Sequence, residues 1–453
     1  MSQRHLLQTT AALAADYLDG LATRAVVPTP AALEGLRALD RPFPDGPADP
    51  TSVLEELHGV ASPATIASAG GRFFGFVVGG SLPAALAANW LAATWDQDAG
   101  LRVMAPGAAA IEEVALRWLL EVLSLPAGSA GGFVTGATMA NFTGLAAARH
   151  ALLARAGWDV EARGLFDAPP LSVVVSDEVH VSVLKALGLL GLGRDRVVRV
   201  PTDEHGRIRA SEMPSLDERT IVCVQAGNVN TGAIDPVGEI ARVAHRAQAW
   251  VHVDGAFGLW AAAAPTRAHL VAGVEEADSW ALDAHKWLNV PYDSGIALCR
   301  DPAALEGAMA ATAAAYLVRS AAREPDAYTP ELSRRSRGVE IWAALAALGR
   351  SGLADLVERC CRHATRFAQG LGAAGYEILN EVTLNQVLVS FGDDATTRAV
   401  IAAVQTDGTC WCGATVWHGR AAMRISVSSW ATTTEDVEQS LAAMIRLARR
   451  GAP

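Results

Sequence analysis

The stretch SWALDAHKWLNVPYDS, residues 279–294, carries the lysine on which the interpretation of the whole chain depends. Lys286 lies directly after His285 and before Trp287, among apolar and aromatic neighbours. A lysine in such surroundings loses hydration, which favours its neutral amine over the ammonium form. The neutral amine condenses with a carbonyl group to give a Schiff base. Taken alone, the stretch also fits a surface lysine beside a turn.

A carboxylate at the end of a hydrophobic run supports the first interpretation. The run WVHVDGA, residues 250–256, is rich in β-branched residues up to Asp254. Open α/β sheets present site residues at the C-terminal ends of such strands. Asp254 and Lys286 together suit pyridoxal phosphate, because a carboxylate would keep the pyridine nitrogen protonated while a lysine would hold the aldehyde carbon.

The sequence around these two residues resembles the group II pyridoxal-phosphate decarboxylases of the aspartate aminotransferase superfamily. HVDGA around Asp254 and DAHKW around Lys286 carry the resemblance, which runs in order from about Gly71 to the C-terminus. The family includes aromatic amino-acid, glutamate and cysteine-sulfinate decarboxylases. The resemblance implies a fold type I, transferase-like α/β fold, pyridoxal phosphate as cofactor, and a homodimer with a shared active site.

Composition restricts the class of protein. The 453 residues are 51% hydrophobic and 19% charged, which is typical of a globular chain. A formal net charge of −11 argues against a nucleic-acid partner. The six cysteines include no C-x-x-C pair, so we expect reduced thiols and no metal site. No signal peptide is evident, and no apolar run reaches the ~20 residues that span a bilayer. We therefore expect a cytoplasmic protein without a membrane partner.

Three short helices are predicted before the main sheet, over residues 5–24, 31–39 and 51–60. Their apolar faces cannot form a core of their own. In the resembling family such a segment packs on the second subunit, and packing on its own subunit is the alternative. The predicted units are residues 1–70, a dimer-packing helical segment; 71–330, a large cofactor-binding α/β domain with a lid; and 331–453, a small α+β domain.

Strand–helix alternation between about residues 131 and 300 predicts a mostly parallel, helix-covered sheet. The run GGFVTGATMAN, residues 131–141, places small residues before a helix, whose free N–H groups form an anion site. A phosphate would bind the amides after Gly136 and the Thr138 hydroxyl. The resemblance places the cofactor phosphate at Ala137 and Thr138. It further assigns Ser279 and His285 to the phosphate side.

Two further residues match catalytic positions of the family. His180 follows a buried strand, where the resemblance places a histidine stacked on the cofactor ring; a structural histidine is the alternative. Tyr316 lies in a charged, proline-interrupted stretch typical of a mobile lid. It matches the lid tyrosine that protonates Cα after carbon dioxide leaves, and a core tyrosine is the alternative. Val229 stands where many relatives carry threonine, so one hydrogen bond near the ring is expected to be absent.

The substrate side chain is less well determined. Aromatic residues near Phe74 favour an aromatic amino acid, whereas Arg102 and its neighbour Arg72 favour an acidic one. Arg424 lies on a short predicted strand where relatives carry an arginine, and it suits either a carboxylate or the domain interface. We take Phe74, Arg102 and Arg424 as the substrate-binding candidates.

Decarboxylation of an L-amino acid to its amine is the predicted reaction. Tyr316 on a lid would supply the acid that this reaction needs at Cα. Transamination is an alternative, in which Lys286 itself would carry the proton from Cα to the cofactor. A carbon–carbon lyase acting on a β-hydroxy amino acid is another alternative, and a non-catalytic protein that retains the fold is the last.

Overall fold

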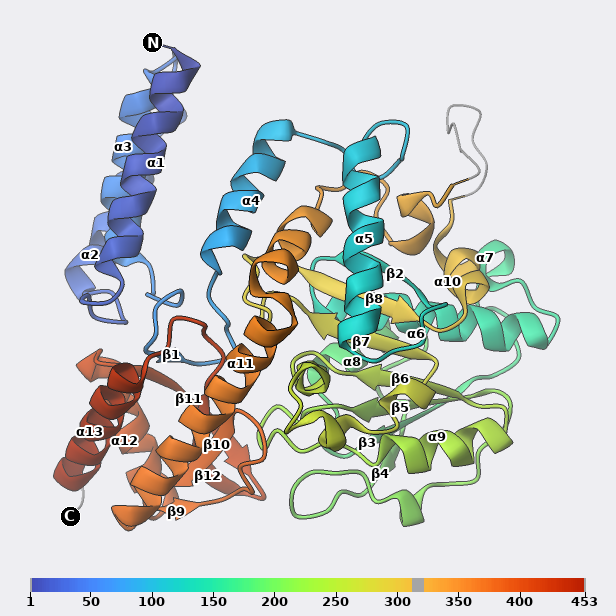
Figure 1. The fold of residues 1–453 in the computed structure, drawn as a ribbon. Helices are drawn as coiled ribbons and strands as arrows, with labels where there is room; N and C mark the ends of the chain where they lie inside the picture. Colours follow the sequence, from blue (N-terminus) through green and yellow to red (C-terminus); the bar gives the residue numbers. More distant parts are fainter. Residues whose placement is uncertain (1, 312–321, 452–453) are drawn as a thin grey trace.

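The computed structural model of the protein describes residues 2–311 and 322–451. Its larger sheet has seven strands in the order β2-β8-β7-β6-β5-β3-β4 (Figure 1). These strands are β2 (Ala130–Val134), β3 (Ser172–Ser176), β4 (Val198–Val200), β5 (Thr220–Gln225), β6 (Trp250–Asp254), β7 (Ser279–Asp283) and β8 (Gly295–Cys299). The four pairings from β7 to β4 are parallel, and β8 runs antiparallel to both its neighbours. The predicted mostly parallel sheet is confirmed.

Both faces of this sheet are buried, because alternate residues of each strand enter different hydrophobic clusters. In β3, Val174 packs with one cluster and Val173 and Val175 with the other. The helices around the sheet are α5 (Pro106–Val122), α6 (Ala137–Arg155), α7 (Val160–Arg163), α8 (Val181–Leu189), α9 (Val237–Arg246) and α10 (Pro302–Met309). Residues of α5 and α9 belong to the first cluster and residues of α6, α8 and α10 to the second.

The smaller sheet has five strands in the order β1-β11-β12-β10-β9. They are β1 (Phe73–Phe74), β9 (Glu377–Ile378), β10 (Gln386–Ser390), β11 (Trp411–Trp417) and β12 (Arg420–Ser426), with helices α12 (Asp394–Asp407) and α13 (Thr434–Gly451). β1 pairs in parallel with β11, although it lies about three hundred residues before the other strands of this sheet in the sequence. The glycine-rich loop after β1 therefore lies between the two sheets.

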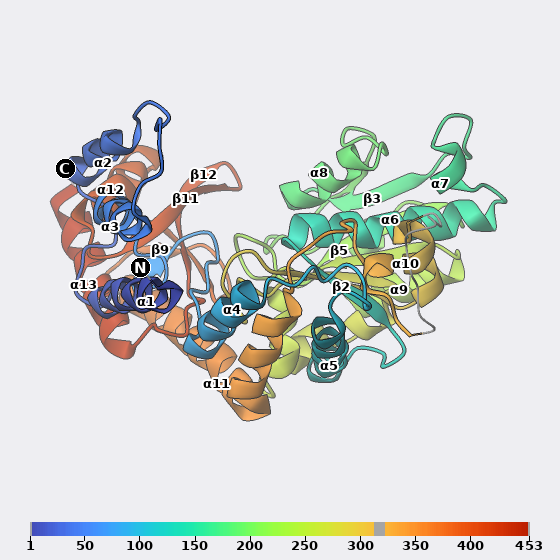
Figure 2. The ribbon, with the colours of Figure 1, turned by 90° about the horizontal axis from the view of Figure 1, so that it is seen from above.

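Two long helices connect the sheets. α4 (Pro83–Trp95) packs along α11 (Gly338–Ala373), which runs from the large unit to the small one (Figure 1). α11 is kinked at Gly349, whose backbone is not helical and has a φ of 57°. Seen from above, α4 and α11 lie between the two lobes of the molecule (Figure 2).

The N-terminal segment stands apart from both sheets. It consists of α1 (Gln3–Gly20), α2 (Pro30–Gly35) with a 3₁₀ turn (Leu36–Leu39), and α3 (Pro50–Ala61). These elements lie close to the three helices predicted over residues 5–24, 31–39 and 51–60. α1 and α3 lie side by side and project away from the large unit (Figure 1). Arg72 holds the base of the segment by donating to the carbonyls of Ala22, Arg24 and Thr409. Among the described residues, no helix combines the length and the apolar character that crossing a membrane requires.

Candidate active site

The candidate site lies where β5 and β6 end and the turn after β7 begins. A pocket of ≈ 180 Å³ there is lined by residues of six separate stretches of the chain. They include Phe76, His180, Gln225, Asp254, Lys286 and Arg424. The carboxyl ends of parallel strands meet at one edge of a sheet, which is why residues so far apart in sequence converge here.

Asp254 is held by donors on both carboxylate oxygens. Its Oδ2 accepts from Asn141 Nδ2 at 3.2 Å and from Ser182 Oγ at 3.4 Å, and its Oδ1 accepts from the Ala256 amide at 3.2 Å. The residue is 5% exposed and still lines the pocket. All three contacts donate to the carboxylate, and together they hold it at the wall of the pocket.

His180 caps α8 beside Asp254. His180 Nδ1 lies 2.8 Å from Ser182 Oγ and 3.3 Å from the Ser182 amide, which donates to it. Burial lowers the pKa of His180, while the charge of Asp254 acts in the opposite direction. The ring is therefore neutral at neutral pH, and it lines the pocket.

Lys286 follows β7 and lines the same pocket. Its Nζ lies 2.9 Å from Asp283 Oδ2, and its side chain is 18% exposed. The glycine-rich loop passes directly over its backbone, since a Cβ on Gly79 would lie 1.7 Å from the Lys286 carbonyl oxygen. Only glycine fits at position 79, which keeps the mouth of the site close to the lysine.

The predicted anion site at the start of α6 holds a carboxylate. The Ala137 amide donates to Asp283 Oδ1 at 2.6 Å, and His285 Nε2 lies 3.4 Å from the same oxygen. The Ser294 amide donates to His285 Nδ1 at 3.2 Å, so Nε2 bears the proton that faces Asp283. Burial lowers the pKa of His285, with the Asp283 charge opposing. Gly136 caps this helix, and Thr138 lies in its first turn.

These groups fit the chemistry of pyridoxal phosphate. A buried carboxylate can bind a pyridinium nitrogen, an amine can reach the aldehyde carbon, and N–H groups at a helix start suit a phosphate. One feature opposes a bound phosphate: the Asp283 carboxylate occupies the anion site, and its negative charge would repel the phosphate.

Three predicted site residues lie elsewhere. Ser279 begins β7, at the end of the strand remote from Lys286, and it is fully buried. Its Oγ contacts His252 Nδ1 at 2.8 Å and Trp250 Nε1 at 2.9 Å. The structure therefore does not bring Ser279 to the predicted phosphate side, because the strand carries its side chain into the core at the end remote from Lys286.

The other two residues that lie elsewhere are the substrate candidates Phe74 and Arg102. Phe74 is 1% exposed and packs edge-to-face on Phe367, with ring centroids 5.0 Å apart. Phe76, which is 64% exposed, lines the pocket in its place. Arg102 does not line this pocket, and its Nη1 pairs with Glu113 Oε1 at 2.6 Å. The structure therefore does not bring Phe74 and Arg102 into this pocket.

Arg424 does line the pocket, as predicted. Its Nη1 donates to the Val229 carbonyl at 3.2 Å, while its Nε has no hydrogen-bond partner among the described residues. Burial lowers the pKa of Arg424. Val229 also lines the pocket, so an apolar side chain stands at that wall. Tyr316 falls within residues 312–321, which lie outside the described part of the chain.

The sequence analysis missed three polar residues of the site: Asn141, Gln225 and Asp283. Gln225 ends the buried run of β5 beside Asp254, with which it pairs in the sheet, so its strand-end position was a usable signal. Asn141 lies one helical turn after Ala137, and Asp283 immediately precedes the AHK motif. Their contacts join segments more than a hundred residues apart, which local patterns do not reveal.

Comparisons with known proteins agree with this geometry. The model of the family "Pyridoxal-dependent decarboxylase conserved domain" matches residues 33–392. The chain is 28% identical to tryptophan decarboxylase 1 of Oryza sativa subsp. japonica over 91% of this chain and 87% of that protein. It is 30% identical to L-2,4-diaminobutyrate decarboxylase of Rhizobium meliloti (strain 1021) over 81% of this chain and 75% of that protein.

Solved structures give the same fold. The crystal structure of Oryza sativa TDC with PLP and tryptamine superposes with a TM-score of 0.90, at 24% identity, over 99% of this chain and 97% of that one. Mouse CSAD superposes with a TM-score of 0.88, at 23% identity, over 98% of each chain. At these identities the likeness establishes the fold alone, and it confirms the predicted fold type I class.

Proposed function

The chain belongs to the pyridoxal-dependent decarboxylase family, and from this premise we propose which residues hold the cofactor, move protons and select the substrate. The enzyme is a pyridoxal-phosphate-dependent carboxy-lyase that converts an L-amino acid to an amine and carbon dioxide. The predicted reaction and cofactor are confirmed, and the relatives do not favour transamination or carbon–carbon cleavage.

We assign the cofactor site to the pocket that Asp254 and Lys286 line together, which is the observation that carries the proposal. Bound pyridoxal phosphate supplies a protonated ring that accepts the electron pair left at Cα when carbon dioxide departs. Asp254 binds the ring nitrogen, Lys286 holds the aldehyde carbon, and His180 covers one face of the ring. The start of α6 (Gly136, Ala137 and Thr138) binds the phosphate with His285.

Tyr316 is the proposed acid that delivers a proton to Cα after decarboxylation. The proposal rests on its match to the lid tyrosine of the family and on the need for an acid other than Lys286. Replacement of Tyr316 by phenylalanine should lower amine formation by about 10²- to 10⁴-fold, the usual contribution of a positioned general acid. Cofactor binding should be retained. An unchanged rate of amine formation would assign the proton to another group.

An aromatic amino acid is the proposed substrate. Phe76, Val77 and Phe257 give the pocket an apolar wall, and Arg424 leaves a free Nε for a carboxylate. Relatives named tryptophan decarboxylase and tyrosine decarboxylase fit this choice, while the diaminobutyrate and aspartate decarboxylases represent other substrate classes.

The experiment is mass spectrometry of products after the cofactor-loaded enzyme is incubated with a panel of L-amino acids. Amines from tryptophan, tyrosine or phenylalanine would support the proposal. Amines from acidic or diamino substrates alone would retain the reaction but contradict the substrate class. Keto acids or aldehydes as main products would contradict the residue roles given above.

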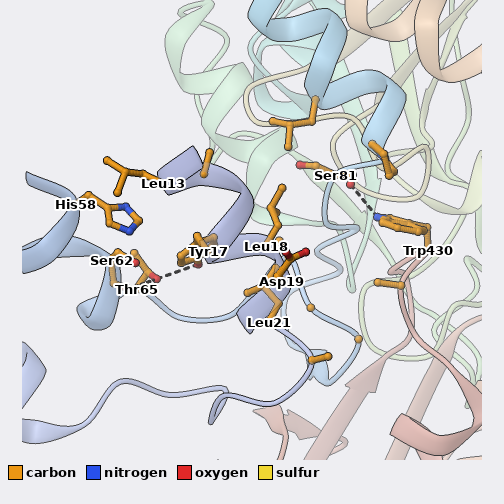
Figure 3. A pocket seen from close by; sticks show the side chains of 18 of the residues that line it. Leu13, Tyr17, Leu18, Asp19, Leu21, His58, Ser62, Thr65, Ser81 and Trp430 are labelled. Atoms are coloured by element: carbon orange, nitrogen blue, oxygen red, sulfur yellow. Dashed lines mark hydrogen bonds between the residues drawn. The ribbon is translucent and has the colours of Figure 1, made fainter. Parts of the chain in front are cut away.

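A homodimer is the proposed assembly, with residues 1–70 packed on a second copy. α1 has no buried residue, and Leu7, Leu18 and Leu57 on the projecting helices are between 41% and 54% exposed. Beside them lies an apolar groove of ≈ 1100 Å³, into which Leu13, Leu18 and Leu21 point (Figure 3). A two-fold axis would place the same patch on itself and bury both copies of these leucines.

The oligomer is tested by light scattering of the full chain and of a Leu7→Glu/Leu57→Glu variant. A dimer for the first and a monomer for the second would support the interface, and a monomeric full chain would contradict it. If each active site uses residues of both copies, mixed dimers of Lys286→Ala and Tyr316→Phe subunits should regain activity.

A cytoplasmic location is proposed from the cysteines. All six are free and buried in the structure, as expected in a reducing compartment. Fractionation of the source cells should find the protein in the cytosolic fraction.

A further inference from the structure

A chain of hydrogen bonds runs through the core behind Asp254. Trp250 Nε1 donates to Ser279 Oγ at 2.9 Å, and Ser279 Oγ lies 2.8 Å from His252 Nδ1. His252 Nε2 lies 2.8 Å from Asn141 Oδ1, and Asn141 Nδ2 donates to Asp254 Oδ2 at 3.2 Å. His252, Asn141 and Ser279 are all fully buried. The chain therefore ends on the carboxylate that lines the pocket but otherwise stays out of reach of ligands.

The two ends of this chain determine the direction of every bond within it. A tryptophan N–H can only donate, and a carboxylate oxygen can only accept. Asn141 must therefore turn its nitrogen toward Asp254 and its carbonyl oxygen toward His252. A carbonyl accepts, so His252 carries its proton on Nε2, and its bare Nδ1 accepts from the Ser279 hydroxyl.

The charge state of His252 agrees with this assignment. Burial lowers the pKa of His252 to about 4, although the charge of Asp254 acts in the opposite direction. The ring is neutral at neutral pH, as a single-proton tautomer requires. All polar atoms of the chain then have a partner of the right kind.

We propose that His252 is a positioning residue for the cofactor: its Nε2 proton fixes the Asn141 amide so that a donor, not an acceptor, faces Asp254. The inference deepens the proposed function and rests on the assignment of Asp254 to the ring nitrogen. Without the Nε2 proton, no donor at His252 favours the carbonyl oxygen of Asn141 over its amide nitrogen. A rotated amide would present oxygen to Asp254, which would favour a protonated carboxyl and weaken its bond to a pyridinium nitrogen.

Two substitutions at one position separate this role from simple packing. Glutamine can place an amide nitrogen near the former Nε2, whereas asparagine reaches only the position of Nδ1. Both remove ring atoms from the core and should lower the melting temperature. Only His252→Asn removes the donor that faces Asn141. A third variant, His363→Asn, removes a buried histidine that does not line the pocket and controls for the loss of stability.

The readouts are the dissociation constant of pyridoxal phosphate from each apoenzyme and the ¹⁵N chemical shift of the cofactor's pyridine nitrogen. A hydrogen bond to a charged group typically changes an equilibrium by about 10- to 100-fold, so His252→Asn should weaken cofactor binding by that factor. It should also move the ¹⁵N signal toward the unprotonated ring. His252→Gln and His363→Asn should stay within about threefold of the parent, with an unchanged ¹⁵N signal.

The outcomes distinguish this inference from the proposed function. If Asp254→Asn leaves the ¹⁵N signal unchanged, the assignment of Asp254 to the ring nitrogen fails. If Asp254→Asn shifts the signal but His252→Asn behaves like His363→Asn, only the role of His252 fails. The protonation of His252 in the wild-type enzyme gives a test that does not depend on any variant folding. Histidine ¹⁵N spectra should show an Nε2–H tautomer, and an Nδ1–H tautomer or an imidazolium would overturn the proposal.

Discussion

The two carboxylates on either side of Lys286 are held by different means. Asp254 accepts from an amide side chain, a hydroxyl and a backbone N–H, all of them neutral and all supplied by the core. Asp283 instead contacts the Lys286 amine, the Ala137 amide and His285. Those are the groups that we propose for the attachment of the cofactor and for its phosphate. In this proposal the ring-nitrogen end of the site is arranged before the cofactor binds, while the Asp283 carboxylate occupies the phosphate end.

Loss of the lysine between the two carboxylates should have the largest effect. Lys286 and Lys185 are the only lysines in the sequence, and Lys185 is exposed on α8. Lys286→Ala should lower activity by about 10⁴-fold or more, as removal of a covalent catalytic group commonly does. Lys185→Ala is the matched control and should retain full activity.

Borohydride reduction of the cofactor-loaded enzyme checks the same assignment directly. It fixes the cofactor permanently to the lysine that holds it, and peptide mass spectrometry should find it on Lys286. A label on Lys185 would contradict the assignment of the site.

The pre-arranged end is tested by Asp254→Asn, which keeps the shape of the side chain but removes its charge. Removing one partner of a buried ion pair costs about 3–5 kcal/mol, so cofactor affinity or turnover should fall by about 10²- to 10⁴-fold. The measurement is amine formation together with the cofactor dissociation constant. A fall of less than about tenfold in both quantities would mean that the charge of Asp254 contributes little to cofactor binding or turnover.

The comparison also shows how far sequence alone can lead. Asp254 and Lys286 were identifiable because strand ends and an apolar lysine environment are local patterns. Phe76 and Val77 line the pocket while Phe74 does not, and their positive φ angles, 54° and 57°, break the alternation that a strand pattern assumes. Asp283 was missed because its contact with Ala137 depends on how the turn after β7 folds back onto α6. Local patterns therefore locate the elements, whereas the contacts between them decide which side chain faces the ligand.

Acid should destabilise the folded protein in part through His252, in the core behind Asp254. Burial lowers the pKa of His252 to about 4 from an ordinary 6.5. Between these values the unfolded chain binds a proton that the folded protein does not, so the free energy of unfolding falls as the pH drops below about 6.5. Urea unfolding should lose about 2 kcal/mol from this residue by about pH 5.

The His252→Gln variant isolates that contribution. Burial also lowers the pKa of other histidines, so the parent enzyme loses stability in acid for several reasons: His180, His285 and His363 act in the same direction. The difference between parent and variant should shrink toward acid pH. Equal pH dependence in the two proteins would show that His252 is already protonated, or is not buried, in the folded enzyme.

At the other carboxylate, a charge-removing substitution should strengthen cofactor binding. Asp283→Asn keeps an oxygen for the Ala137 amide but no longer repels a phosphate or pairs with the Lys286 amine. Like charges in a partly screened site typically cost about 1–2 kcal/mol, so the apoenzyme should bind pyridoxal phosphate about tenfold more tightly. Pyridoxal without its phosphate should gain less, because only the release of Lys286 remains to help it. Asp167→Asn, on an exposed loop, gives the same change in net charge and should leave both affinities unchanged. Weaker binding of pyridoxal phosphate to Asp283→Asn would reverse the interpretation: the carboxylate would then be part of the cofactor site, orienting His285 and the start of α6, and both ends of the site would be arranged in advance.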